Sequence, residues 1–141
     1  MINRIRSSRS GLFLIELIIV ILFFALGSAI CIQVFARAHL TSQAARDLTF
    51  ASEQAASAAS LLKGTDGSLE AIQEYYPLAE ASGEDLFLYY DGNRQPCSRQ
   101  DAAYTLLIHT TRSGHQNIAH ITVSAHDDQT LYELETRRAL P

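Results

Sequence analysis

Cysteine and proline are scarce in this chain: it has two cysteines and three prolines, and it has no tryptophan. Cys31 lies inside a long apolar run and Cys97 in a predicted loop, so the two cannot meet within one chain without breaking the predicted helix around Cys31. The sequence therefore excludes an intrachain disulfide. We expect Cys97 to be an ordinary loop residue, and a reactive thiol is the alternative.

Basic residues are also scarce in most of the chain. Beyond Ala36 there are eight lysines and arginines against 14 acidic residues, a formal charge of −6. A nucleic-acid-binding surface needs a basic footprint to neutralise phosphates. This part of the chain has none, so we expect no nucleic-acid partner for it. The exception is the N-terminus, where Arg4, Arg6 and Arg9 form a short basic leader.

The sequence has no spaced metal-binding motif and no nucleophile elbow. His109 and His120 fall on predicted neighbouring strands, and His126 lies beside Asp127–Asp128. Structural and catalytic zinc sites typically have three or four converging protein ligands, and a calcium loop has regularly spaced acids. We expect these histidines to face solvent. The alternatives are a zinc site at the histidines and a calcium site formed by Asp127, Asp128 and Asp91. The sequence predicts a protein that is not an enzyme and carries no cofactor.

The chain's main feature is the apolar run Leu12–Ile32, 21 residues in which Glu16 is the only charge and Ser28 the only other polar residue. About 20 apolar residues in a helix cross a membrane. A carboxylate inside such a run is costly, so it is expected to have a functional partner. The alternative is a Glu16 that reaches the lipid headgroups.

Two other kinds of N-terminal signal fit this run poorly. A secretory signal has an apolar region of about 7–15 residues before its cleavage site, and this run continues past the small residues Gly27 and Ser28. A lipoprotein signal has a small residue before its cysteine, whereas Ile30 precedes Cys31. We therefore expect neither.

The basic leader, Gly11, the apolar stretch and Glu16 five residues after Gly11 together resemble the class III signal of type IV prepilins and pseudopilins. The resemblance implies that a prepilin peptidase cuts between Gly11 and Leu12 and methylates the new amine of Leu12. It also implies that Glu16 is the carboxylate used in filament assembly. The family usually has Phe or Met after the glycine, and Leu12 keeps the bulky apolar character.

The resemblance further implies a minor structural subunit of a type IV pilus or a type II secretion-like pseudopilus. Its partners would be other pilin or pseudopilin subunits and an inner-membrane assembly platform with a cytoplasmic ATPase. The amine of one processed subunit would then neutralise Glu16 of a neighbour. The alternatives are a membrane-anchored binding or sensory domain that never polymerises, and a signal-anchored enzyme.

Charge asymmetry predicts the orientation of the membrane segment. Three arginines precede the run and Arg37 follows it, so the positive-inside rule places the N-terminus in the cytoplasm and the remaining chain outside. The protein is then a single-pass membrane protein that enters an extracellular filament on assembly. The lack of a disulfide in an exported domain is more typical of a Gram-positive-type envelope.

The helix is expected to continue beyond the membrane. We divide the chain into a leader (1–11), a membrane and filament-core helix (12–37) and an amphipathic continuation (38–63). Residues 38–63 contain neither Gly nor Pro and are rich in alanine, the strongest helix former. A stripe at spacings of three and four predicts the face that packs under a sheet: Leu40, Ala44, Leu48, Ala51, Ala55, Ala59 and Leu62.

The rest of the chain reads as a connector (64–85) and a sheet (86–141). Ser68 is positioned to cap a short helix over 68–76 that Pro77 ends. Turn signals then separate four predicted strands, at 86–90, 103–111, 118–124 and 130–136. Short loops between consecutive strands predict an antiparallel meander. The predicted fold class is α+β, a long N-terminal helix under a sheet of about four strands.

Overall fold

The structure, a computed structural model, describes the backbone of residues 2–140 and the side chains of residues 9–140. Its first element is the helix α1, Ile2–Gly64, of 63 residues. The chain divides into two units, one ending at Ala44 and the other starting at Ala45, so α1 contributes to both. α1 begins before Leu12, the predicted first residue of the processed helix, because no proline interrupts the leader. The side chains of Arg4 and Arg6 lie outside the described residues.

In the first unit, the large apolar side chains of α1 are uncovered. From Leu12 to Phe35 they are 46–79% exposed. One helix near the N-terminus, Arg9–Gly64, is long and apolar enough to cross a membrane. The prediction of a membrane-length helix is confirmed at this level. The helix continues through Gly27 and Ser28, where the Ser28 hydroxyl donates to the carbonyl of Phe24 at 2.9 Å.

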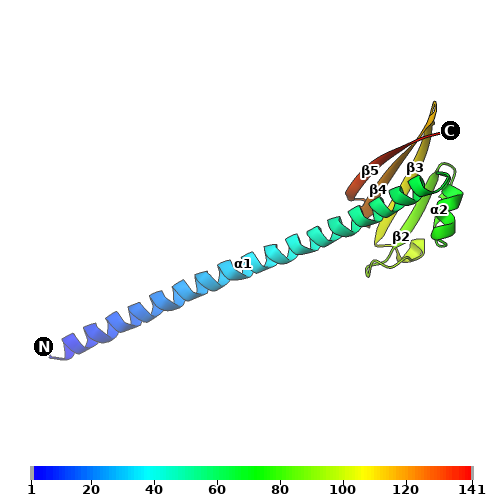
Figure 1. The fold of residues 1–141 in the computed structure, drawn as a ribbon. Coiled ribbons are helices and arrows are strands. Elements are labelled where there is room, and N and C mark those ends of the chain that lie inside the picture. Colours follow the sequence, from blue (N-terminus) through cyan, green and yellow to red (C-terminus); the bar gives the residue numbers. More distant parts are fainter. Residues whose placement is uncertain (1, 141) are drawn as a thin grey trace. The chain divides into compact units, whose positions relative to one another are not determined.

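The second unit is built on one five-stranded antiparallel sheet (Figure 1). Its strands follow chain order: β1 Glu80–Ser82, β2 Asp85–Tyr90, β3 Tyr104–Ser113, β4 Gln116–Ala125 and β5 Thr130–Ala139. The predicted meander and the α+β class are confirmed, but the predicted number of strands was wrong by one. β1 was missed because its three residues are all exposed and show no alternation.

The end of α1 covers one face of this sheet. Buried side chains from α1 and from β2, β3 and β4 form a single apolar cluster, and the largest fully buried ones include Leu86, Leu106, Ile108, Ile121 and Val123. The contribution of α1 is mostly alanine: Phe50, Ala51, Ala55, Ala58, Ala59 and Leu62. Small side chains let a helix approach a sheet closely.

The predicted stripe on α1 was therefore only partly right. Its last four members are buried, but Leu40 is 65% and Leu48 50% exposed. The stripe also missed Phe50, which is 8% exposed and has its ring centroid 5.3 Å from that of Tyr90. The spacing of apolar residues extends the predicted stripe back to Leu40, whereas burial in the second unit starts only at Phe50.

The connector begins where hydrogen bonds close the end of α1. The Arg138 guanidinium donates to the carbonyl of Leu62 at 3.1 Å, and the Thr65 amide donates to that of Leu61 at 2.9 Å. These bonds satisfy carbonyls that a helix end leaves free. The short helix α2, Leu69–Tyr75, follows, and the predicted cap is confirmed because the Ser68 hydroxyl accepts from the Ala71 amide. A 3₁₀ turn, Arg99–Asp101, precedes β3.

Candidate functional site

The predicted processing and assembly residues lie in one continuous stretch of α1. Leu12 is 64% exposed, and Glu16 is also exposed. Residues four apart in a helix share a face, with about 5–6 Å between their Cβ atoms. Glu16 therefore lies on the same face as Leu12, one turn further along. A methyl group added at Gly11 would meet no atom within 4 Å, so nothing in this structure requires glycine there for packing.

A polar cluster in the second unit joins α1 to the chain that links β2 and β3. Asp47 accepts a hydrogen bond from the Arg94 guanidinium at 3.0 Å and another from the Tyr104 hydroxyl at 2.8 Å. The Arg94 guanidinium carbon is also 5.6 Å from the centroid of the Phe50 ring. Burial, together with the hydrogen bond to Asp47, raises the pKa of Tyr104.

Sequence reasoning missed this cluster, because 47 and 57 residues separate Asp47 from its two partners. Its only local signal was the turn signal that follows the predicted strand at 86–90, at Asp91-Gly92-Asn93. In the structure, the Asp91 carboxylate accepts from the amides of Asn93 and Gln95, each at 2.9 Å. Arg94 has a φ of 61°, in the left-handed region. The turn thereby directs Arg94 toward α1, and the cluster fixes the helix to the sheet.

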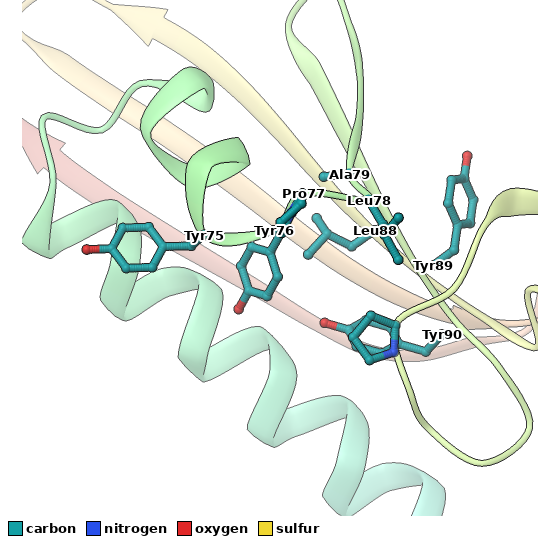
Figure 2. Close-up of a pocket in the computed structure, with 9 residues that line it drawn as sticks. Tyr75, Tyr76, Pro77, Leu78, Ala79, Leu88, Tyr89 and Tyr90 are labelled. Carbon is teal, nitrogen blue, oxygen red and sulfur yellow. The ribbon is translucent and has the colours of Figure 1, made fainter.

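An apolar hollow of about 230 Å³ lies beside α2 (Figure 2). It is lined by the end of α2 and the turn after it, by β2 and by Pro96. Figure 2 shows the ring of Tyr89 pointing away from that of Tyr90, as alternation along a strand requires. The Tyr90 hydroxyl donates to Gln54 at 3.0 Å, and burial raises the pKa of Tyr90. The lining side chains are those of tyrosine, leucine, proline and alanine, so the hollow offers mainly apolar contact.

The structure separates most of the predicted candidate ligands. His126 and Asp127–Asp128 lie in the turn between β4 and β5, whereas the Asp91 carboxylate binds backbone amides. Among the side chains of residues 9–140, no three His, Cys, Asp or Glu residues are grouped to hold a metal ion. His109 and His120 are brought together, because they are register partners on β3 and β4. Both of their side chains are about half exposed.

No protein-family model, curated protein or solved structure matches the chain. The structure itself has the general layout of pilin-like proteins, an apolar N-terminal helix followed by an antiparallel sheet. A function for the chain therefore rests on the arrangement of its own residues.

Proposed function

We propose that the chain is a non-enzymatic, minor structural subunit of a type IV pilus or a type II secretion-like pseudopilus. A prepilin peptidase cuts it between Gly11 and Leu12, and the amine of Leu12 is methylated. The membrane stores the subunit with its N-terminus in the cytoplasm, and an assembly platform with a cytoplasmic ATPase then inserts it into a helical filament. The sheet faces outward in that filament.

The observation that carries this proposal is the position of Glu16. It is the only charge in the apolar run Leu12–Ile32 of the long helix and lies one turn after the bond that would be cut. An isolated carboxylate in hydrocarbon is unfavourable by roughly 2.5–3.5 kcal/mol at mid-membrane on insertion scales, and by less near an end. A positive amine at Leu12 of a neighbouring subunit would offset that cost and set the stagger between subunits.

The difference in burial between the apolar side chains of the sheet unit and those of residues 12–35 also supports this proposal. The sheet unit buries its own apolar residues, whereas the large side chains of residues 12–35 are exposed. A filament core made of such helices would cover them after they leave the lipid. A lone membrane anchor would also use this apolar surface, but it gives Glu16 no partner.

The deciding experiment is the intact mass and N-terminal sequence of the membrane-extracted protein, with and without a co-expressed prepilin peptidase. We expect a chain that starts at methylated Leu12 only when the peptidase is present. A chain that still starts at Met1, in cells where the peptidase processes a control prepilin, would refute the proposal. It would instead favour a membrane-anchored binding or sensory domain.

Gly11→Ala sharpens that test. The added methyl group has open space in this structure, so folding of the chain should be unchanged. Crowding at the scissile bond should nevertheless slow cleavage. We expect the cleavage rate in the same co-expression assay to fall at least about tenfold, which corresponds to about 1.4 kcal/mol of activation free energy. Ser10→Ala, which leaves the glycine in place, is the matched control. Normal processing of Gly11→Ala would contradict the assigned cleavage site.

A further inference from the structure

Four titratable side chains form a row across the outer face of the sheet. The strand register pairs Asp85 with His109, His109 with His120, and His120 with Glu135, across β2, β3, β4 and β5. Directly paired residues of antiparallel strands point to the same face. That face is the one away from the core, because the next residues along β2 and β4, Leu86 and Ile121, are fully buried. We call these four residues the Asp–His–His–Glu row.

A carboxylate lies beside each imidazole of the row, on the side away from the other imidazole. The distance from His109 Nδ1 to Asp85 Oδ1 is 2.5 Å, and that from His120 Nδ1 to Glu135 Oε2 is 3.8 Å. Glu135 also accepts from the Arg137 guanidinium at 2.6 Å, and this bond lowers the pKa of the Glu135 carboxyl. Glu135 is therefore ionised at neutral pH.

The contact with Asp85 involves Nδ1 of His109, so Nε2 is the ring nitrogen that faces away from that carboxylate. A carboxylate oxygen accepts hydrogen bonds, and in a neutral imidazole whose Nδ1–H donates to such an oxygen, Nε2 keeps its lone pair. Thr111 Oγ1 lies 3.2 Å from that Nε2, and an ion bound to Nε2 would replace this contact. A carboxylate on one imidazole nitrogen and a lone pair on the other is the arrangement found for metal-binding histidines.

A solvated sheet face with two ion pairs is the simpler explanation. It accounts for each histidine–carboxylate pair, which at 36–52% side-chain exposure contributes little to stability. It does not account for two imidazoles placed directly opposite each other. When both are protonated they repel, and when both are neutral they place two nitrogen ligands side by side.

We propose that His109 and His120 chelate one divalent transition-metal ion through their Nε2 atoms, with Asp85 and Glu135 orienting the two rings. Directly opposed residues have Cβ atoms about 4.5–5.5 Å apart, a span that two imidazoles can bridge around an ion at bonds of about 2.0–2.1 Å. Because no three ligating side chains among residues 9–140 are grouped around one point, water fills the remaining positions. Imidazole ligands select Cu²⁺, Ni²⁺ or Zn²⁺ over Ca²⁺ and Mg²⁺.

The test is calorimetric titration of the full-length protein, in detergent micelles, with Cu²⁺, Ni²⁺ and Zn²⁺, and with Ca²⁺ for comparison. We expect one ion per chain and the tightest binding for Cu²⁺. His109→Ala and His120→Ala should each weaken binding at least about tenfold, and the double variant should be little worse than either, because a chelate is lost with its first ligand. His126→Ala, in the turn after β4, is the matched control and should bind as the wild type does.

Three outcomes would overturn the proposal: no saturable binding, equal weakening by His126→Ala, or small additive losses from the two row variants. A preference for Ca²⁺ over Cu²⁺ would overturn it as well.

If an alanine variant loses its folded circular dichroism signal, His109→Gln keeps a polar side chain there and should show the same loss of affinity. Asp85→Asn retains both ligands and should weaken binding about 10–100-fold. Unchanged affinity in Asp85→Asn would remove the orienting role. None of these measurements depends on filament assembly.

Discussion

The two parts of α1 have the same helical backbone but differ in the size and the burial of their side chains. Residues 12–35 carry large apolar side chains that this structure leaves exposed, whereas from Phe50 onward the helix buries mostly alanine under a sheet. Large side chains suit a surface that meets lipid or other helices, since they bury much area. Alanine buries little area but permits close approach of the sheet.

This difference indicates where each part gets its stability. The sheet unit encloses its own core and is fixed to α1 by contacts such as those of Asp47 with Arg94 and Tyr104. The large side chains of the apolar part are exposed in the structure, and under the proposed function a membrane or neighbouring subunits would cover them. Substitutions in the apolar part should therefore affect filament assembly, whereas substitutions in the sheet unit should affect the free energy of unfolding.

Glu16→Ala should have the largest effect and should act on assembly alone. We expect at least a tenfold loss of the protein from sheared filaments, with cleavage at Gly11 largely intact, because the partner of a neighbour's amine is removed. Glu53→Ala changes an exposed glutamate of the alanine-rich part and is the control. Immunoblots of filament and membrane fractions measure both steps. Wild-type incorporation of Glu16→Ala would contradict the assembly role.

Ala55→Leu should destabilise the sheet unit. Ala55 is fully buried, whereas its neighbour Ala56 is exposed. Alanine and leucine have similar helix propensities, so the comparison isolates packing. Overpacking should cost about 1–3 kcal/mol of unfolding free energy in Ala55→Leu, and Ala56→Leu should cost far less. Urea unfolding in detergent, followed by near-UV circular dichroism, measures the difference, and equal midpoints would argue against close helix–sheet packing.

Tyr104→Phe tests the cluster at Asp47 with a smaller effect. The change removes one hydrogen bond to Asp47 and leaves the Arg94 contact in place, so we expect a loss of about 0.5–1.5 kcal/mol in the same unfolding assay. Tyr75→Phe alters an exposed tyrosine, 62% accessible, and should be neutral. Equal stability of the two variants would mean that the Tyr104 hydroxyl is satisfied by water instead.

The smallest expected effect is a dependence on alkaline pH. Burial raises the pKa of Tyr90 above the ordinary value of about 10, so below pH 10 the residue is neutral in both the folded and the unfolded chain. Above pH 10 the unfolded chain ionises first, and the free energy of unfolding should fall as pH rises. Tyr90→Phe should show a shallower fall in unfolding midpoint between pH 8 and pH 11 than Tyr75→Phe. Identical slopes would contradict a buried Tyr90 hydroxyl.

Much of the fold followed from local patterns. The helix of residues 38–63, its end at Gly64 and the Ser68 cap depended on propensity and capping, and the structure has all three. The sequence predictions for Gly11, Leu12 and Glu16 stay predictions, because processing and assembly involve other proteins. The stripe failed at Leu40 and Leu48 because periodicity gives a helix face but not the length of that face that a sheet will cover.

The sequence by itself determined the membrane-length helix, the meander order and the α+β class, because apolar length, helix propensity and turn residues act over a few neighbours. Only the tertiary structure decided that burial starts at Phe50, that Asp47 meets Arg94 and Tyr104, and that His109 lies opposite His120. Those contacts depend on strand register and on helix–sheet docking between segments far apart in the chain. A shift of register by one residue would move every side chain of a strand to the other face, and no local pattern reports it.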